Sequence, residues 1–405
     1  MMRSRTLSSL VGRRRYHRLP AEVEARLCTP ALVIYGDVVR GNIAKVIEAC
    51  GSPRRWQPHI KTVKSSWAVE ALCEAGVRHF KCATSREAEL LASTLARRPA
   101  AEGPFDVLVA FPHAGPTLGR VARTAAGPGR DRIRWSVLAE DGGGAVRVAA
   151  AGEAAGADLG VFLDVNCGMD RTGASLSSGG AKRVLDEVLS GAAATKLRGL
   201  HMYDGHAASL GDDLEARARA LFPLYDDLLA LDDRGALDLI TAGTPALEAS
   251  LAHAGLAESG RHRVSAGTVV LSDTRAAAQC PVGLRPAAVV ASRVISTPLE
   301  NQFTLDAGVK ALAADCGHPM CDVLERPDFE PRIPSEEHLP VTVAPGGAMP
   351  AKGDLFYLVP KHVCPTVNLA ESALLVDGGA FRELPIEARA HPLFLDEAPV
   401  AAAAA

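Results

Sequence analysis

Short apolar runs alternate with longer amphipathic stretches along most of the chain, from about Thr29 onward. The apolar runs, bounded by Gly, Pro and polar residues, are typical of buried strands, and stretches such as Ser85–Leu95 and Leu176–Leu189 have helical spacing. The predicted strands are Gln57–Lys61, His79–Ala83, Phe105–Phe111, Ile133–Leu138, Leu159–Val165, Leu197–Tyr203, Leu237–Thr241 and Arg261–Ala266. Eight strands with helices between them, over roughly 220 residues, predict a (β/α)8 barrel of the α/β class.

Two segments of this region need separate assignments. Thr29–Tyr35 predicts a strand, and Asp37 then caps a helix that runs to about Cys50. Leu210–Leu231 has helical spacing but contains Pro223, which predicts a kink or a break there.

The pattern changes after about Ser272, where helical spacing fades and strands broken by Pro and Gly follow one another. The strands predicted here are Val289–Ile295, Phe303–Asp306, Val341–Val343, Leu355–Val359 and Ala373–Val376. This pattern predicts a second, C-terminal, mainly-β domain. The predicted division is a basic, disordered tail (1–20), the barrel (21–272), the β domain (273–395) and a C-terminal tail (396–405), with the strand at 29–36 alternatively joining the β domain.

Composition excludes several classes of protein. Of the 405 residues 48% are hydrophobic, so a large core can be buried, and a net charge of −3 argues against a general nucleic-acid binder. No apolar run reaches the ~18–20 residues that a membrane span needs. The nine cysteines are scattered, without a paired Cys-x-x-Cys framework, which indicates reduced thiols. We expect a cytoplasmic protein; the arginines of the N-terminal tail leave organelle targeting as an alternative.

Lys61 lies where the first predicted barrel strand gives way to a helix that begins near Ser65. Side chains at this end of a barrel strand face the mouth of the barrel, where active sites of this architecture lie. A lysine that loses its proton by desolvation there can attack a carbonyl. We therefore interpret Lys61 as a Schiff-base lysine that holds pyridoxal phosphate; the alternative is an ordinary surface lysine.

Other polar residues follow the ends of later strands. Arg171 comes after the fifth predicted strand, and His201 and Tyr203 end the sixth. Arg171 could face a cofactor ring or a substrate carboxylate, or it could form a structural ion pair with Asp164 or Asp170. His201 and Tyr203 share one face of their strand, so His201 is either a catalytic residue or a buried histidine with satisfied hydrogen bonds.

Two Gly-Thr turns follow the last two predicted strands, Gly243-Thr244 after the seventh and Gly267-Thr268 after the eighth. In barrels of this type the loops after these two strands commonly hold phosphate. Glycine allows a close backbone approach, and amide N–H groups together with a threonine hydroxyl bind a dianion. The two turns are therefore predicted to bind the phosphate group of the cofactor.

His362 and Cys364 form a second candidate site, in the β domain. They are two residues apart in a segment predicted to be extended, so both side chains would leave it on one face. An imidazole and a thiolate together suit Zn²⁺, and two protein ligands leave positions open for water or substrate. The pattern therefore predicts a catalytic metal site; the alternative is a histidine and a buried cysteine in an ordinary strand.

Six segments together resemble the D-threonine aldolase and D-serine dehydratase family, and the resemblance extends from about Thr29 to Ala390. The segments are Pro58-His59-Ile60-Lys61-Thr62, Gly168-Met169-Asp170-Arg171-Thr172-Gly173, Tyr203-Asp204-Gly205-His206, Asp306-Ala307-Gly308-Val309-Lys310-Ala311-Leu312, Ser335-Glu336-Glu337-His338 and His362-Val363-Cys364-Pro365-Thr366-Val367-Asn368-Leu369. The resemblance implies an alanine-racemase-type (fold type III) pyridoxal phosphate enzyme with a barrel, a β domain and usually a homodimeric assembly.

The same resemblance implies roles for individual residues: Lys61 as the Schiff-base lysine, Arg171 beside the cofactor ring, His362 and Cys364 as ligands of a divalent metal, and Gly243, Thr244, Gly267 and Thr268 on the phosphate. We expect Zn²⁺ as the metal, with Mn²⁺ and Mg²⁺ as alternatives. His59 and His201 are further candidate catalytic residues, and His201 and Tyr203 are candidate cofactor contacts.

The chain departs from the family in ways that bear on its reaction. Val63 stands where a histidine often follows the Lys-Thr pair, and His201 stands where aldolases tend to carry glutamine. Aldolases typically use Asp as the second metal ligand, whereas dehydratases use a His-x-Cys pair, as with Cys364 here. We expect a metal-dependent lyase that cleaves β-hydroxy-D-amino acids to glycine and an aldehyde, with dehydration of D-serine to pyruvate and ammonia as the main alternative. A racemase with Tyr203 or Tyr357 as second base, a non-catalytic cofactor carrier and a barrel without a cofactor are further alternatives.

Overall fold

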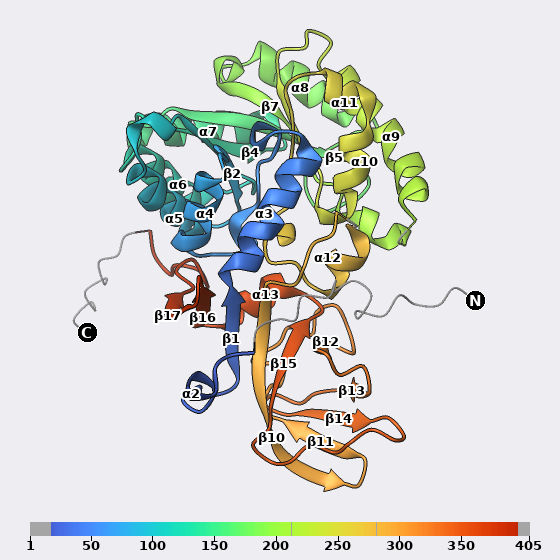
Figure 1. Cartoon of the computed structure of the whole chain (residues 1–405). Helices are drawn as coiled ribbons and strands as arrows, with labels where there is room; N and C mark the ends of the chain where they lie inside the picture. The colour runs from blue at the N-terminus through green and yellow to red at the C-terminus, as the bar shows by residue number, and fades with distance from the viewer. Residues whose placement is uncertain (1–17, 212, 281, 396–405) are drawn as a thin grey trace, which may run out of the picture. The chain divides into compact units, whose positions relative to one another are not determined.

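The computed structural model describes residues 18–211, 213–280 and 282–395, and the chain divides into two compact units (Figure 1). The first unit consists of the described part of Met1–Ala49, together with Thr62–Trp67 and Thr268–Arg389. The second consists of Cys50–Lys61, Ala68–Gly267 and the described part of Ala390–Ala405. Of the two predicted tails, residues 1–17 and 396–405 lie outside the described residues.

The second unit contains a curled sheet of parallel strands in the order β2-β3-β4-β5-β7-β8-β9, with the short β6 paired to β5. The strands are β2 (His79–Cys82), β3 (Phe105–Val109), β4 (Ile133–Ala139), β5 (Leu159–Asn166), β6 (Ala174–Ser175), β7 (Leu197–Met202), β8 (Asp238–Thr241) and β9 (His262–Val264). Trp56 bridges Val264 of β9, and His59 bridges Lys81 of β2, so the segment between them takes the place of an eighth strand. The predicted α/β barrel is confirmed.

The first predicted barrel strand, Gln57–Lys61, is present only as these two bridges. Pro58 has no N–H to donate, which limits how far the segment can pair with its neighbours. Lys61 itself lies in the 3₁₀ turn η2 (Ile60–Thr62), so the prediction that it ends a strand is corrected.

Helices surround the parallel strands, as Figure 1 shows. They are η1 (Pro53–Arg55), α4 (Ser66–Glu74), α5 (Ser85–Ala96), η3 (Ala100–Glu102), α6 (Gly115–Ala126), α7 (Gly142–Ala155), α8 (Gly180–Ser190), η4 (Ala194–Lys196), η5 (Gly205–Leu210), α9 (Leu214–Leu231), η6 (Thr244–Ala246), α10 (Leu247–Ala252) and α11 (Ala254–Glu258). Of the kink or break predicted at Pro223, the break is wrong, because α9 continues through this residue, and the kink stays a prediction. Leu221, Tyr225 and Leu228 are fully buried, and this packing outweighs the hydrogen bond that the proline removes.

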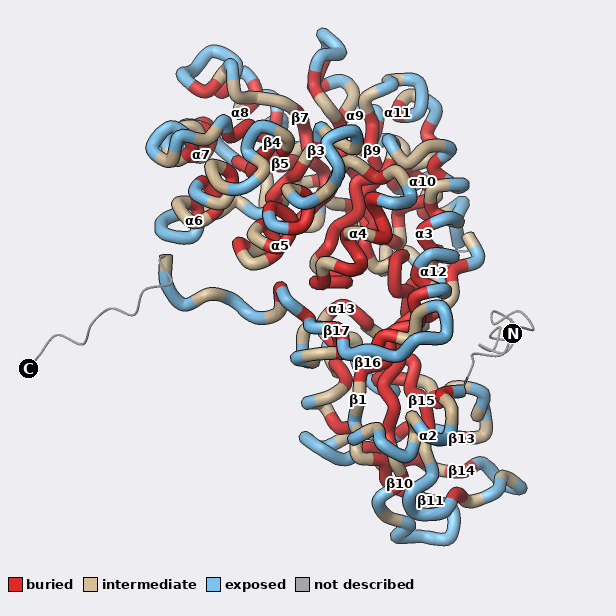
Figure 2. Tube along the Cα trace, turned by 60° about the vertical axis from the view of Figure 1, so that its left-hand side comes forward, coloured by how far each residue is buried: buried red, intermediate tan, exposed pale blue. Residues whose placement is uncertain are grey.

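The interior of the barrel contains a cluster of apolar side chains and, next to this cluster, two polar side chains. Leu108, Leu138, Phe162 and Ile240 form one buried cluster, and buried residues follow the strands in Figure 2. Lys81 pairs in register with Leu108. His201 pairs in the same way with Ile240. Because side chains at paired positions of neighbouring strands leave a sheet on the same face, these two polar side chains also point into the barrel.

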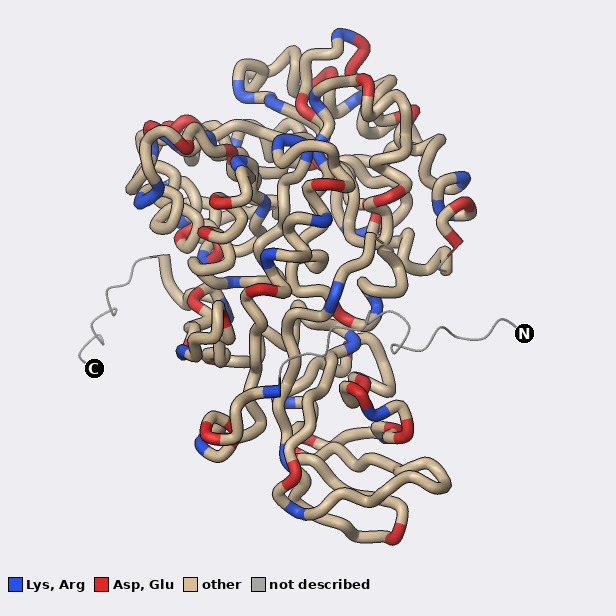
Figure 3. The backbone as a smooth tube through the Cα atoms, in the orientation of Figure 1, with Lys and Arg blue, Asp and Glu red and all other residues tan. Residues whose placement is uncertain are grey.

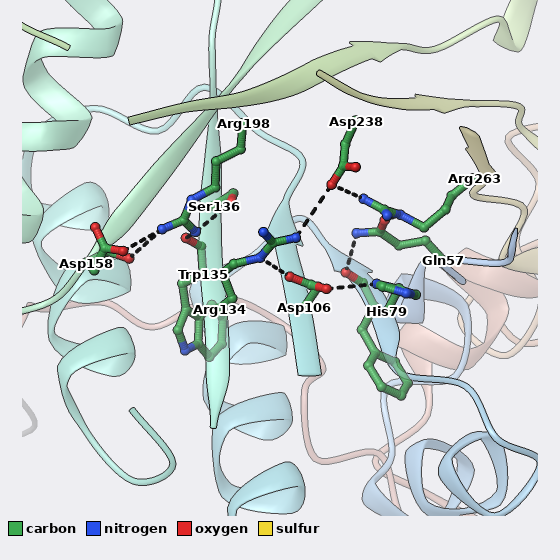
Figure 4. A network of polar contacts seen from close by, with 11 residues as sticks. Gln57, His79, Asp106, Arg134, Trp135, Ser136, Asp158, Arg198, Asp238 and Arg263 are labelled. Carbon is green, nitrogen blue, oxygen red and sulfur yellow. Dashed lines mark hydrogen bonds and ion pairs between the residues drawn. The ribbon is translucent and has the colours of Figure 1, made fainter. Parts of the chain in front are cut away.

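A network of charged side chains joins the first residues of several barrel strands (Figure 4). Asp106 contacts both His79, with 3.0 Å between Nδ1 and Oδ2, and the guanidinium of Arg134. Asp238 lies 2.7 Å from Nη2 of Arg263 and 3.5 Å from Nη2 of Arg134. Because its members come from β2, β3, β4, β8 and β9, the network joins strands on both sides of the sheet at their N-terminal ends.

Substitution of Asp106 by Ala is expected to lower the free energy of unfolding by about 1–2 kcal/mol, because two basic partners lose their shared carboxylate. Burial alone would raise the pKa of Asp106, but its contacts with His79 and Arg134 lower the pKa to about 2. A carboxyl group whose pKa falls on folding stabilises the fold above its unfolded pKa and loses this contribution as the pH drops through its folded pKa.

The difference in unfolding free energy between the parent protein and the Asp106→Ala variant should therefore shrink between about pH 4 and pH 2. Denaturant unfolding across this range measures it. The exposed Asp131→Ala change serves as the control and should have little effect. An equal loss of stability at every pH would contradict the role of the Asp106 charge.

The first unit is built on a mixed sheet with the strand order β13-β14-β11-β10-β1-β16-β17, in which β15 pairs with β10 and β12. Its strands are β1 (Ala31–Tyr35), β10 (Ala288–Leu299), β11 (Gln302–Leu305), β12 (Cys321–Val323), β13 (Phe329–Pro331), β14 (Leu339–Val343), β15 (Leu355–Pro360), β16 (Ser372–Asp377) and β17 (Ala380–Pro385). Its helices are α2 (Ala21–Glu24), α3 (Gly36–Cys50), η7 (Thr268–Val270), α12 (Thr274–Gln279) and α13 (Val363–Leu369). The predicted mainly-β domain is confirmed.

The N-terminal strand is part of this sheet. β1 runs antiparallel to β10 and parallel to β16. Val33, Tyr35, Val289 and Tyr357 contribute to the core cluster on one of its faces. β1 is apolar throughout and buried from Leu32 to Tyr35, so both of its faces are covered.

The distribution of charge, the hydropathy of the helices and the state of the cysteines follow from the described residues. Figure 3 shows basic and acidic residues interspersed along both units. Among the described helices, none combines the length and the hydropathy that crossing a membrane requires. None of the nine cysteines, all of which lie in the described part of the chain, forms a disulfide.

Candidate active site

Lys61 is positioned by the turn in which it lies. Its backbone N–H donates to Nδ1 of His59 at 3.3 Å, so the preceding histidine helps to fix the backbone of η2. The side chain of His59 is nine-tenths buried. A catalytic role for His59 stays a prediction, because this contact alone accounts for a histidine at that position.

Three basic side chains gather around the ring of Tyr203. Nζ of Lys61 and Nζ of Lys81 each lie 6.0 Å from the ring centroid, and Cζ of Arg171 lies 4.7 Å from it. None of the three forms an ion pair with a carboxylate in the part of the chain that the structure describes. Like charges gathered in this way repel one another, and an anionic ligand would relieve the repulsion.

The alternative in which Arg171 pairs with a neighbouring aspartate is not found among the described residues. Asp164 accepts a hydrogen bond from Thr172 at 2.7 Å. Asp170 accepts one from the side-chain amide of Asn166 at 3.0 Å. Arg171 instead lies over the ring of Tyr203, beside a small pocket that it helps to line. This leaves its guanidinium available to a ligand.

A buried polar chain runs across the barrel interior from Asp164 through His201 to Lys81. Nδ1 of His201 lies 2.8 Å from Oδ1 of Asp164, and Nε2 of His201 lies 3.3 Å from Nζ of Lys81. Burial, and then the charge of Lys81, lowers the pKa of His201. Burial would raise the pKa of Asp164, but the hydrogen bond with His201 lowers it overall. His201 is therefore a neutral imidazole held in one orientation.

The Gly243-Thr244 turn is built around a buried carboxylate. The amide N–H of Gly243 donates to Oδ1 of Asp204 at 2.8 Å, and Tyr225 donates to Oδ2 at 2.8 Å. The Gly243 amide is thus already engaged, which differs from the expectation that it faces a phosphate. The hydroxyl of Thr244 is buried and has no hydrogen-bond partner among the described residues. Such an orphaned donor needs a ligand atom or water.

The second predicted phosphate turn, Gly267-Thr268, shows close packing and a sulfur contact. A Cβ atom on Gly267 would lie 2.2 Å from the carbonyl oxygen of His59, so only glycine fits there. Oγ1 of Thr268 lies 3.3 Å from Sγ of Cys364. Neither contact involves a phosphate, and the role predicted for this turn stays a prediction.

The residues of the barrel fit pyridoxal phosphate. This cofactor carries a phosphate dianion and an acidic ring hydroxyl, and its aldehyde needs an amine. The barrel offers the amine of Lys61, two further cations without carboxylate partners and the orphaned hydroxyl of Thr244. The donor set therefore has the charge and the hydrogen-bonding capacity that the cofactor requires.

His362 and Cys364 do not lie on an extended segment, so that prediction is corrected. His362 is the N-cap of α13, and Cys364 lies in the first turn of this helix. Pro365 lacks the N–H that the first turn of a helix leaves unused, so it favours a helix start here over a strand. The two predicted ligands therefore lie at a helix N-terminus, where a spacing of two residues does not place both side chains on the same face.

A group of metal-type ligands surrounds His362. Nδ1 of His362 lies 2.6 Å from Oδ2 of Asp315 and 3.5 Å from Sγ of Cys316. Ligand atoms of these three residues all lie within 4.8 Å of one another. Burial lowers the pKa of His362, but Cys364 and Asp315 raise it to about 9 overall. Negative groups that hold a proton on an imidazole in this way also suit a metal cation.

Two hydroxyl groups contact the thiol of Cys364 within the first unit. Oγ1 of Thr62 lies 3.0 Å and Oγ1 of Thr268 lies 3.3 Å from Sγ. Thr62 is also the residue that follows Lys61 in the chain. Imidazole, thiol and carboxylate groups around His362 form a donor set that fits Zn²⁺. Mn²⁺, a harder cation that prefers oxygen ligands, stays an alternative.

Sequence reasoning missed four residues of these two clusters. Lys81 follows the same logic as Lys61, since it lies near the end of the second predicted strand, but a single lysine there carries no distinctive spacing. Asp164 lies in an otherwise apolar strand, and a charged residue at such a position is a signal from which a functional role could have been predicted. Asp315 and Cys316 lie in a loop far along the chain from His362, so only the tertiary fold brings them together.

Comparison with known proteins identifies the relatives of this chain. Residues 287–376 match the family model described as a putative serine dehydratase domain. A D-threonine aldolase from an Arthrobacter species is 26% identical over 388 residues, which cover 90% of this chain and 93% of that protein.

Two solved structures have the same fold. The D-threonine aldolase of Filomicrobium marinum superposes with a TM-score of 0.77 at 26% identity, covering 90% of this chain and 96% of that one. The D-threo-3-hydroxyaspartate dehydratase of Delftia sp. HT23 has a TM-score of 0.73 at 20% identity, covering 91% and 99%. The predicted resemblance and the predicted lyase class are confirmed: the chain is similar to D-threonine aldolases over nine-tenths of its length, and residues 287–376 match a putative serine dehydratase domain.

Proposed function

We propose that this protein is a pyridoxal phosphate- and metal-dependent lyase that cleaves β-hydroxy-D-amino acids to glycine and an aldehyde. The observation that carries the proposal is a group of three cations around the ring of Tyr203. They are Lys61, Lys81 and Arg171, and none of them has a carboxylate partner among the described residues. The choice of reaction and substrate class is supported by two D-threonine aldolases whose similarity covers nine-tenths of this chain.

The cofactor supplies one thing that side chains lack, an electron sink for the charge that develops at Cα of the substrate. Lys61 would supply the amine that binds the cofactor's aldehyde, and its Nζ would hold or release a proton beside the cofactor. Arg171 lies where it can face the ring, and the Thr244 hydroxyl supplies an unused donor for an anionic group. Burial and the charge of Lys81 lower the pKa of His201 and favour the neutral imidazole, while Asp164 binds Nδ1, so Nε2 of His201 accepts a hydrogen bond and does not add a further charge.

A divalent metal is the second proposed requirement. His362 and Cys364 are the proposed ligands, with Asp315 hydrogen-bonded to Nδ1 of His362 as a group that orients the imidazole. A bound metal would supply a Lewis acid for the β-hydroxyl group of a substrate. Cys316 belongs to the group of possible metal ligands, with its Sγ 3.5 Å from Nδ1 of His362, and a thiol with an imidazole favours Zn²⁺ over Mg²⁺.

Dehydration of D-serine is the second candidate, and a specific observation favours it. The group of possible metal ligands contains a thiol, that of Cys316, which is the ligand type that the dehydratases of the family use, and residues 287–376 match a putative serine dehydratase domain. Racemisation is less well supported. The hydroxyl of Tyr357 contacts Glu24 at 2.9 Å and the Leu19 amide at 3.3 Å, and burial raises its pKa.

A product assay tests the proposal. The purified protein, loaded with pyridoxal phosphate and Zn²⁺ or Mn²⁺, is incubated with D-threonine and D-serine, with the L-isomers as controls. Glycine and acetaldehyde from D-threonine are expected. Pyruvate and ammonia from D-serine, without glycine from D-threonine, would establish the dehydratase instead, and no product from any β-hydroxy-D-amino acid would contradict both. The homodimer and the cytoplasmic location stay predictions.

A further inference from the structure

Lys81 is a second lysine inside the barrel, and the mechanism proposed above gives it no task. It lies in β2, is 3% exposed and pairs in register with a residue of the apolar interior cluster. Its Nζ contacts Nε2 of His201 at 3.3 Å and the hydroxyl of Ser265. A fully buried lysine without a carboxylate partner is rare, because burying an ammonium group is costly unless it is paired.

The hydrogen bonds around Lys81 leave one of its donors unused. Asp164 accepts from Nδ1 of His201, so Nε2 of His201 is an acceptor for Lys81. The hydroxyl of Ser265 donates to the backbone oxygen of Thr241 or Ala242, at 3.1 or 3.2 Å, so its oxygen accepts from Lys81. A protonated amine has three N–H donors. The third has no partner within the described residues.

Lys81 therefore lies close to the boundary between its two protonation states. Burial, and then the charge of Lys61, lowers the pKa of Lys81 to about 7. The groups that face it are Lys61, Asp164, Arg171, His201, Tyr203, Asp204 and Ser265. An anionic oxygen placed at the third donor would favour the charged form and satisfy that donor at once.

We propose that Lys81 is a second ligand-binding cation of the barrel, which donates a hydrogen bond to an anionic oxygen held beside Lys61. That oxygen comes either from the ring of pyridoxal phosphate or from the carboxylate of the amino-acid substrate. The proposal rests on the proposed function only in taking these two molecules as the ligands. The Asp164–His201 pair acts as the support that orients Lys81, since His201 has no other acceptor position to offer.

The test is the Lys81→Met variant, in which an apolar side chain of similar length removes the charge. Pyridoxal phosphate is titrated into the parent protein and the variant at several pH values, and its visible absorbance reports binding. D-threonine and D-threonine methyl ester, which lacks the carboxylate charge, are then titrated into each cofactor-loaded protein with the same absorbance as the readout. The exposed Lys196→Met variant is the matched control.

If the oxygen belongs to the cofactor, Lys81→Met should weaken binding of pyridoxal phosphate by at least about tenfold, since a hydrogen bond from a charged donor is lost. If it belongs to the substrate, cofactor binding should be unchanged, and binding of D-threonine should weaken about tenfold while the methyl ester is unaffected. Cofactor and amino-acid affinities that both stay within about twofold of the parent's would overturn the proposal.

Thermal unfolding shows whether the variant folds, and we expect it to, because methionine carries no burial cost for charge. Lys81→Gln, which keeps hydrogen bonding without charge, provides the same comparison by a second route. Failure of the proposed lyase function can be distinguished from failure of the role proposed for Lys81. A parent protein that binds pyridoxal phosphate but releases no product contradicts the lyase, while weaker cofactor binding by Lys81→Met still supports the role of Lys81.

Discussion

Replacement of Lys61 by Ala is expected to abolish the visible absorbance of the lysine-bound cofactor and to lower turnover by at least about 10³-fold. The variant loses the amine that binds the cofactor's aldehyde and, with it, the proton that its Nζ holds or releases. Lys61 lies in a turn fixed by His59 and is partly exposed, so removing its side chain should leave the barrel folded. The absorbance spectrum of the purified variant, with pyridoxal phosphate added in excess, is the measurement.

Lys196→Ala is the control for this experiment, because Lys196 is an exposed lysine paired with Asp158. It should keep the parent's spectrum and turnover. A visible band that persists in Lys61→Ala would show that another lysine holds the cofactor, and Lys81 is the amine that would then be assigned. Such a result would contradict the assignment of Lys61.

Replacement of Cys364 by Ala should lower bound metal to a small fraction of that of the parent protein and reduce turnover at least about 100-fold, while the visible absorbance remains. The thiol is one of the proposed metal ligands, and it contacts the hydroxyls of Thr62 and Thr268. Metal content is measured by mass spectrometry of the purified protein after dialysis. Turnover is measured on the substrate identified by the product assay.

The exposed Cys28→Ala variant provides the matched control, since it removes a thiol that lies outside the cluster. It should retain metal and turnover. Unchanged turnover in Cys364→Ala, with metal content reduced, would remove the metal from the reaction. Unchanged metal content would instead assign the site to Asp315, Cys316 and His362 without Cys364.

Much of the barrel could be predicted because parallel strands buried on both faces leave a clear signal in the sequence. The strands that contain His201 and Asp164 were located to within a few residues, and so were their positions in the order of strands. The first strand was harder, because Pro58 reduces it to two bridges and moves Lys61 into a turn. Periodicity reports where apolar residues lie, and it carries no information on how many hydrogen bonds a strand makes.

The details of the candidate site depended on contacts that sequence cannot show. His362 and Cys364 were identified as a pair, but the helix that begins between them was not, because a strand and a short helix look alike over so few residues. The Gly243 amide was expected to be available, whereas Asp204 occupies it. The proposal that Lys81 binds an anionic ligand depends on its having no carboxylate partner within the described residues, and only the folded structure shows this.

Identification of the lysine that carries the cofactor tests the central claim most directly. The protein is loaded with pyridoxal phosphate, the bound form is reduced with borohydride to a stable secondary amine, and the modified peptide is located by mass spectrometry. The account predicts that the modification lies on Lys61, in the segment Gln57–Lys64. A modification on Lys81 or on a surface lysine, with Lys61 unmodified, would contradict it.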